Sequence, residues 1–170
     1  GQTLRLEISI PPQAFFLTEG GRRRKNPGAF SQTLKKHMAS LFCRSFTNPP
    51  FDRRATLALA PSPNGPASHF LHIEIMGRQN DIILCDQDII IASTRPPKPG
   101  AARLLQPGDR YSPPLMPAKT APVSLTGPLL GLLLANLGQV SSEQALVKTI
   151  LGVSPLLARE ICLRAGAANT

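Results

Sequence analysis

Acidic and basic residues lie within four positions of each other at two places in the sequence, and this arrangement could bind an anion. Asp52 is followed directly by Arg53 and Arg54, and Glu74 precedes Arg78 by four residues. A guanidinium offers a planar fork of donors that suits a phosphate or the edge of a guanine, and a neighbouring carboxylate can orient that fork. The same residues could also form a structural ion-pair network.

The turn after Glu74 adds a second feature of this kind. Gly77 follows a predicted strand and permits a sharp turn and a close backbone approach. Arg78 would then project from the end of the strand towards a ligand. The two groups are therefore candidates for binding an anion, with the structural ion-pair network as the alternative.

Side chains for other chemistry are poorly spaced. A hydrolytic triad drawn from Ser68, His69 and Asp52 lacks the nucleophile elbow that would support it. The cysteines are odd in number, widely spaced and without a CxxC pair, at positions Cys43, Cys85 and Cys162. They predict neither a disulfide framework nor a zinc cluster, and they fit a reducing cytosol. We therefore expect no metal, no cofactor and no enzyme activity.

Charge favours a polyanionic partner. The 170 residues carry 19 Lys and Arg against 10 Asp and Glu, a formal net charge of +9. Residues 1–54 hold ten basic against three acidic residues, so +7 of that charge lies in the first third. Nucleic acid is the leading partner class, although an acidic membrane or solubility alone would suit the same charge. The longest apolar stretch, near residues 129–134, is far too short to span a bilayer, so no membrane partner is expected.

The elements that would position these residues are short strands followed by helices. Hydrophobic content of 42% with 17% charged residues is near the globular norm, so disorder and fibrous repeats are excluded. Alternating apolar residues separated by turn signals predict strands at residues 4–10, 14–17, 55–60, 69–76, 81–85 and 89–92. Tight turns between these strands favour an antiparallel sheet, which we expect to form a small β-sandwich.

Helices are predicted on both sides of a segment rich in Pro and Gly. Apolar residues at helical spacing predict an amphipathic helix over residues 30–42, capped by Ser31. Further helices are expected at 125–137, 142–151 and 155–165, with Ser141 starting a capping box and Gly166 as a C-cap. We therefore expect an α+β protein with a β-rich domain at 1–93, a loop or linker at 94–123 and a helical subdomain at 124–170.

The last two helices read as a helix-hairpin-helix. Ser154 stands at the N-cap position and Pro155 at the first helical position, three residues after Gly152. Such a turn aims backbone N–H groups at a phosphate, which makes Gly152, Val153 and Ser154 candidate phosphate contacts, although a purely structural helix pair is about as well supported. Basic candidates for the same role are Arg22, Arg23, Arg24, Lys25, Lys35, Lys36 and Arg54.

The order and spacing of several short motifs resemble the NFACT family, whose N-terminal domain is traditionally labelled fibronectin-binding protein A. The resemblance runs from about residue 30 to residue 166. It rests above all on the Asp-Arg pair at 52–53 and on the Glu-Ile-Met-Gly-Arg motif at 74–78. The segments Arg103–Gly108 and Tyr111–Pro114 add to it. After Arg78 the family commonly has His-Ser-Asn, where this chain has Gln79, Asn80 and Asp81.

The resemblance implies a fold similar to formamidopyrimidine-type DNA glycosylases and a role in ribosome-associated quality control. Its members bind large ribosomal subunits obstructed by peptidyl-tRNA and recruit tRNA for tailing the stalled chain. The motif residues implied to bind tRNA are Asp52, Arg53, Glu74, Ile75, Met76, Gly77 and Arg78. The relatives' coiled-coil arms and C-terminal RNA-binding domain would be further partners of this chain in its full-length protein.

Two other functions compete with RNA binding. The historical label suggests an adhesin-like module that binds fibronectin or fibrinogen, which would require export. A DNA glycosylase is less well supported, because such enzymes use an N-terminal proline nucleophile and this chain begins Gly1-Gln2. The sequence therefore favours a cytoplasmic, non-catalytic RNA-binding domain.

Overall fold

The protein divides into two compact units in the computed structural model, Gly1–Pro113 and Pro114–Thr170. The structure describes residues 28–76, 79–95, 103, 105–138 and 140–166, and the backbone alone of 4–9 and 14–19. The predicted basic contacts at Arg22–Lys25 and the motif residues Gly77 and Arg78 lie outside the described residues. The division falls inside the segment predicted as a loop or linker.

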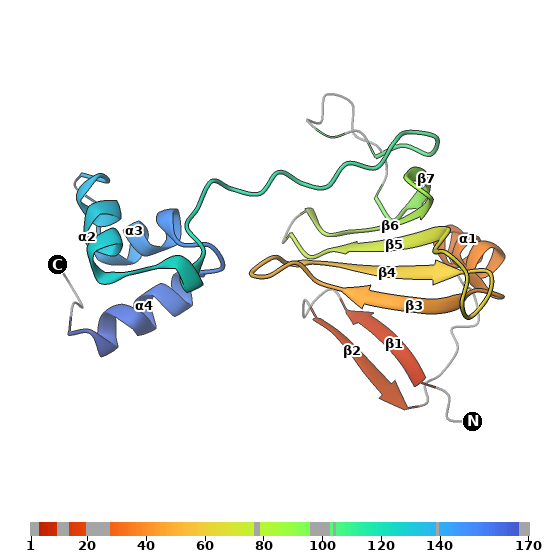
Figure 1. Cartoon of the computed structure of the whole chain (residues 1–170), viewed down its shortest axis with the longest axis horizontal. Coiled ribbons are helices and arrows are strands. Elements are labelled where there is room, and N and C mark those ends of the chain that lie inside the picture. Colours follow the sequence, from red (N-terminus) through yellow and green to blue (C-terminus); the bar gives the residue numbers. More distant parts are fainter. Residues whose placement is uncertain are drawn as a thin grey trace. The chain divides into compact units, whose positions relative to one another are not determined.

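The first unit is built on an antiparallel sheet of five strands in the order β3-β4-β5-β6-β7, which lie side by side in Figure 1. Each strand pairs with its neighbour in sequence, so every connection is a hairpin. The strands are β3 Phe42–Thr47, β4 Arg54–Ala60, β5 His69–Glu74, β6 Asp81–Asp86 and β7 Ile89–Ser93. A separate antiparallel pair is formed by β1 Leu4–Ser9 and β2 Ala14–Glu19.

The alternation of apolar residues therefore predicted six of the seven strands, but β3 was missed. The helix expected over residues 30–42 is the shorter α1, Ala29–Met38, and Phe42 begins β3 instead. Pairing with β4 overrides the helical spacing of the last apolar residues, because backbone partners outweigh local preference. The predicted cap is also wrong: Ser31 lies inside α1, and Gly28 occupies the N-cap position without a side-chain bond.

Part of the predicted loop packs on the sheet. The Ile90 amide donates to the Asp109 carbonyl at 2.9 Å, and the Tyr111 amide donates to the Asp88 carbonyl at 2.7 Å. These bonds hold residues 105–111 along β7, where Leu105 and Tyr111 pack against a cluster of Ile83, Cys85 and Ile90. The segment thus covers apolar surface of the sheet that would otherwise face solvent.

The second unit is helical, with a short 3-10 helix η2 before three α-helices. Their bounds are η2 Pro122–Ser124, α2 Gly127–Ala135, α3 Ser142–Thr149 and α4 Pro155–Arg164. The predicted caps are confirmed: the Ser141 hydroxyl accepts from the Gln144 amide, and the Ser154 hydroxyl accepts from the Leu157 amide at 3.2 Å. Gly166, with φ of 69°, ends α4 in the left-handed region that favours glycine. The α+β class is therefore confirmed.

The buried sheet cluster predicts a large effect of truncating Ile83. This side chain is 0% exposed, whereas Ile89 of β7 is 41% exposed. We expect Ile83→Ala to lower the free energy of unfolding of the first unit by about 3 kcal/mol, because it leaves a cavity. The control Ile89→Ala should lower it by less than about 1 kcal/mol. Urea denaturation followed by circular dichroism measures both, and equal effects would contradict the assigned core.

Candidate nucleic-acid interface

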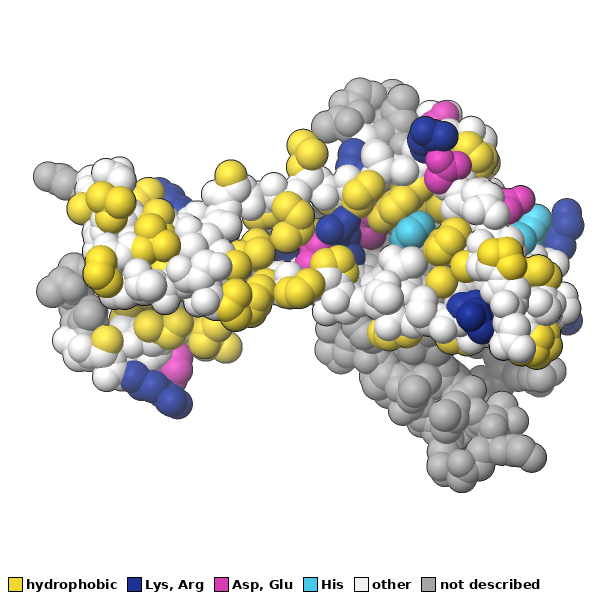
Figure 2. All heavy atoms as spheres, viewed as in Figure 1, with side chains coloured by type: hydrophobic (Ala, Val, Ile, Leu, Met, Phe, Trp, Pro, Cys, Tyr) yellow, Lys and Arg dark blue, Asp and Glu magenta, His cyan; other side chains and the backbone are white. Residues whose placement is uncertain are grey.

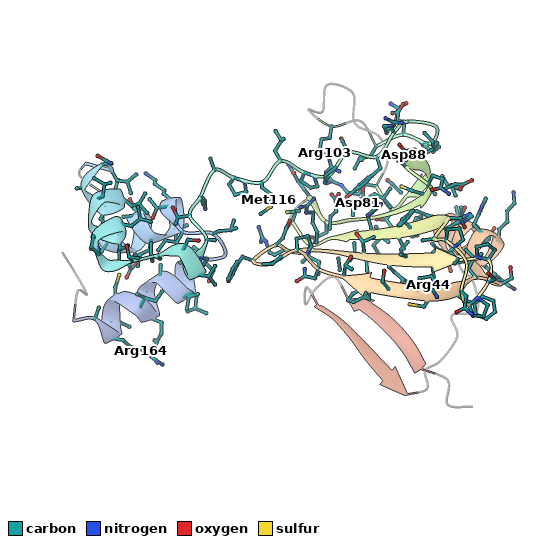
Figure 3. All side chains as sticks on the ribbon, viewed as in Figure 1. Arg44, Asp81, Asp88, Arg103, Met116 and Arg164 are labelled. Atoms are coloured by element: carbon teal, nitrogen blue, oxygen red, sulfur yellow. The ribbon has the colours of Figure 1, made fainter. Side chains whose placement is uncertain are left out.

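The two motif segments meet at one end of the five-stranded sheet. Because neighbouring strands are antiparallel, the start of β4, the end of β5 and the start of β6 share that end. The register places Arg54 opposite Glu74, and Glu74 opposite Asp81. Figure 3 shows Asp81 and Arg103 at this end of the sheet, and Figure 2 shows acidic and basic side chains side by side there.

Glu74 is the centre of the interface and is only 2% exposed. Its two carboxylate oxygens accept from the two terminal nitrogens of Arg103 at 2.9 Å and 3.0 Å, a bidentate ion pair. The Tyr111 hydroxyl donates to the same carboxylate at 2.9 Å. Arg103 also donates to the Ser112 carbonyl from Nε at 3.0 Å. The buried charge is thus fully paired by residues 29 and 37 positions away.

This pairing perturbs both partners of Glu74. Burial alone would lower the pKa of the Arg103 guanidinium, but its hydrogen bond to Glu74 and that charge raise the pKa instead. Burial raises the pKa of Tyr111, and the Glu74 charge raises it further. Arg103 therefore stays a cation and Tyr111 stays a neutral hydrogen-bond donor at every physiological pH.

A stack of rings continues from Tyr111 onto the sheet. The rings of Tyr111 and His72 lie 3.9 Å apart between centroids and are tilted by only 9°. His72 Nδ1 lies 3.0 Å from the Thr56 hydroxyl. Burial lowers the pKa of His72 to about 4, with Glu74 opposing this shift and Arg54 adding to it. His72 is therefore neutral near pH 7 and acts as a flat support for Tyr111.

The Asp-Arg pair forms a second charged group beside the first. The Asp52 carboxylate accepts from Arg54 Nε at 2.5 Å, and the Asp52 side chain is 4% exposed. Asn48 donates its side-chain amide to the carbonyls of Asp52 and Arg54, which fixes the backbone entering β4. Arg53 lies between Asp52 and Arg54 in the sequence, is exposed, and has no ion-pair partner among the residues described. Asp52 therefore holds Arg54, while Arg53 faces solvent.

Asp81 occupies the next strand and is also buried. Its Oδ1 accepts from the Thr94 hydroxyl at 2.7 Å and from the amides of Ile82 and Thr94. Its Oδ2 and the neighbouring Asn80 Oδ1 are buried and have no hydrogen-bond partner among the described part of the chain. Asp81 therefore connects the start of β6 with Thr94, which directly follows β7, at this end of the sheet.

The remaining predicted contacts lie elsewhere. Ile75 is buried in a cluster with Ala55 and Ile73, and Met76 is half-buried. Lys35 and Lys36 are exposed in the last turn of α1, where the rings of His37 and His69 are 6.2 Å apart. His69 starts β5, so these lysines lie towards the opposite end of the sheet. The candidate phosphate contacts at Gly152–Ser154 belong to the helical unit.

Sequence reasoning missed the roles of Arg103, Tyr111, His72 and Asp81. Arg103 and Tyr111 were noticed only as parts of family-like motifs, although Tyr111 is the single tyrosine of the chain. Among the described residues, no group of three or more His, Cys, Asp and Glu is placed to hold a metal. The arrangement offers guanidinium donors held by buried carboxylates, which suits the binding of phosphates.

The sequence matches one protein family and is similar to a curated bacterial protein. The family model described as NFACT N-terminal and middle domains matches residues 1–170. Rqc2 homolog RqcH of Bacillus subtilis (strain 168) is 29% identical over 179 residues, covering 99% of this chain and 31% of the relative. The chain therefore spans about a third of the length of that curated relative.

Solved structures with the same fold include a fibronectin-binding protein and a fibrinogen-binding protein. The N-terminal domain of fibronectin-binding protein PavA from Streptococcus pneumoniae superposes with a TM-score of 0.76 at 23% identity, over 98% of this chain and 64% of that one. The fibrinogen-binding protein from Staphylococcus aureus gives a TM-score of 0.72 at 27% identity, over 95% and 59%. The similarity to PavA shows the fold alone.

The neutral, half-buried His72 predicts a pH-dependent stability. Its pKa in the folded state, about 4, lies below the ordinary value of 6.5, so the unfolded chain binds the proton more readily. Stability from this group is full above pH 6.5 and is lost as the pH falls towards 4, by at most about 3 kcal/mol. Urea denaturation from pH 7 to pH 4 should show a smaller decline for His72→Phe. An identical decline would contradict this origin.

The buried Arg103–Glu74 ion pair predicts that substitutions at Arg103 and at Arg110 lower the free energy of unfolding by very different amounts. Arg103→Gln should lower the free energy of unfolding by about 2–3 kcal/mol, because it leaves the buried Glu74 charge without its cation. The matched control is Arg110→Gln, whose partner is Asp88 and whose side chain is 78% exposed. Its effect should stay within about 0.5 kcal/mol. Adding Glu74→Gln to Arg103→Gln should recover part of the loss, and no recovery would contradict a charge-based cause.

Proposed function

Because the chain belongs to the NFACT family, we propose that it is the non-catalytic, cytoplasmic RNA-binding domain of a ribosome-associated quality control factor. It binds tRNA and takes part in binding large ribosomal subunits that carry stalled peptidyl-tRNA. The remaining domains of the full-length protein complete this activity. The similarity to RqcH, which extends over 99% of this chain, supports the proposal.

One observation carries the proposal: an exposed arginine stands beside a buried, paired acidic network. Arg53 projects to solvent directly between Asp52 and Arg54, which hold each other at 2.5 Å. The Ile75 amide donates to the Arg53 carbonyl at 2.8 Å, so the two motif segments are joined at this residue. Because the backbone of Arg53 is fixed on both sides, binding a phosphate would order only its side chain.

The chain's charge supports the same ligand class. A net charge of +9 attracts a polyanion over a long range, and two buried acidic residues of the interface are already neutralised by arginines. Arg53 is then left without an ion-pair partner at this end of the sheet, within the part of the chain that the structure describes. Phosphates contact such groups without regard to sequence, which suits recognition of tRNA by shape and backbone.

The helical unit supplies a second possible contact, which we include in the proposal as a helix-hairpin-helix. Ser154 and Pro155 begin α4 in exposed positions, and Gly152 has a φ of 78°. The turn thus presents backbone N–H groups and the positive end of the α4 dipole to solvent. A glycosylase-like arrangement with a β-sandwich remains a prediction from the family resemblance.

Among the residues described, every helix is too short or too polar to span a membrane.

A second candidate function is favoured by the solved structures with this fold, which are named for binding fibronectin and fibrinogen. An adhesin-like module would use exposed apolar or basic surface to bind those glycoproteins. It predicts no preference for tRNA over other polyanions.

Binding of tRNA tests the proposed function. We expect the chain to prefer tRNA to duplex DNA, with an affinity that falls steeply with salt. Arg53→Ala should weaken tRNA binding about tenfold and reduce the slope of log K against log salt by roughly 0.7 to 0.9. Fluorescence anisotropy at several salt concentrations measures both quantities, and circular dichroism checks the fold.

The matched control is Arg110→Ala, which removes one exposed positive charge from the same unit. It should leave the slope nearly unchanged if the interface lies where Asp52 and Arg54 place it. Equal effects of the two variants would reduce the interface to a general basic surface. Immobilised fibronectin and fibrinogen are tested in parallel, and binding to them that exceeds tRNA binding would favour the second function.

A further inference from the structure

Arg54 and Glu74 are direct neighbours in the sheet, yet they do not pair with each other. The register places them opposite each other on β4 and β5, so both side chains lie on the same face. Opposite charges in this relation normally attract and form a cross-strand ion pair. The absence of such a pair between these two described residues therefore needs a physical reason.

The reason lies in competing partners for each residue. Glu74 receives two bonds from Arg103 and one from Tyr111, which occupy both carboxylate oxygens. Arg54 is held at Nε alone by Asp52. Its two terminal nitrogens have no hydrogen-bond partner among the residues described, and its side chain is 15% exposed. Asp52 therefore orients the Arg54 side chain but leaves its two terminal nitrogens available for another acceptor.

Loss of Arg103 would change this balance. Glu74 would keep one neutral donor, Tyr111, and would remain a buried charge that seeks a cation. The Arg54 guanidinium is available for this role, because Arg54 lies opposite Glu74 on the neighbouring strand β4. An Arg54–Glu74 pair would then remove the Arg54 fork from solvent and leave a negative potential beside Arg53.

We propose that Arg103 and Tyr111 are positioning residues of the RNA interface, which occupy the Glu74 carboxylate and so keep the Arg54 fork available for a phosphate. This inference rests on the proposed function and uses Arg54, a candidate phosphate contact from the sequence, as a second contact beside Arg53. Arg103 does not touch the ligand in this arrangement, because its nitrogens are engaged by Glu74 and Ser112. The alternative explanation is that the Arg103–Glu74 ion pair has only a structural role and holds the segment from Arg103 to Ser112 on the sheet.

A charge-rescue experiment separates the two explanations. tRNA affinity and its salt dependence are measured for the 170-residue chain carrying Arg103→Gln, Glu74→Gln or both substitutions. We expect Arg103→Gln to weaken tRNA binding about tenfold and to lower the salt slope by roughly 0.7 to 0.9, the value of one phosphate contact. The double variant should bind tRNA at least about fivefold more tightly than Arg103→Gln alone, because no charge remains to capture Arg54.

A purely structural role of the ion pair predicts a different pattern of tRNA binding among these variants. If the ion pair only holds the segment, Glu74→Gln breaks it as Arg103→Gln does, and the double variant binds tRNA no better than either single variant. That result would overturn the inference. The control Arg110→Gln, in the same segment, should change neither affinity nor slope beyond about twofold.

Folding of Arg103→Gln is checked by circular dichroism, and a milder pair of variants serves if it does not fold. Tyr111→Phe removes one donor to Glu74 and keeps the stacked ring. It should weaken tRNA binding about twofold to threefold, and addition of Glu74→Gln should abolish that loss. A loss that persists in Tyr111→Phe/Glu74→Gln would overturn the inference.

The proposed function and this inference fail in distinguishable ways. If the parent and Arg53→Ala bind tRNA equally at every salt concentration, the RNA interface itself is wrong. If Arg53→Ala weakens binding and Arg103→Gln, when folded, does not, the interface stands and only the positioning role of Arg103 and Tyr111 is overturned.

Discussion

The pairing of one buried carboxylate organises the whole interface. Glu74 sits at the end of a central strand, almost fully removed from solvent, where an unpaired charge would be strongly unfavourable. The Arg103 guanidinium and the Tyr111 hydroxyl satisfy it with three hydrogen bonds. Because both partners come from a later segment, pairing the charge also fixes that segment on the sheet. Packing and electrostatics at this end of the unit therefore depend on the same contact.

The fold makes this possible through its topology. A sheet of consecutive hairpins returns the chain to the same end at every second turn, so the start of β4, the end of β5 and the start of β6 converge. Three acidic residues, Asp52, Glu74 and Asp81, arrive there from separate stretches of sequence. Each is neutralised or hydrogen-bonded by a different element, which leaves arginines in place as the groups that reach solvent.

This organisation links family membership to a physical mode of binding. The acidic side chains of the family-like motifs are buried and bonded to protein groups, so in the proposed RNA-binding mode their role is to hold arginines in place. Rigid, preorganised guanidinium groups bind phosphates with little further loss of freedom. The ring stack of Tyr111 and His72 extends the same principle, because a neutral histidine supports the tyrosine without competing for Glu74.

The sequence by itself determined most of the local structure: the alternating strands, the serine caps at Ser141 and Ser154, and the charge that favours a polyanion. It also located the Asp-Arg and Glu-Ile-Met segments as the chemically notable ones. It missed β3, because the apolar spacing near Phe42 fits a helix until β4 offers backbone partners. Only the tertiary structure decided which arginine pairs with Glu74. The nearest cation by register is Arg54, yet a residue 29 positions later takes that place, and local patterns carry no information about such distant contacts.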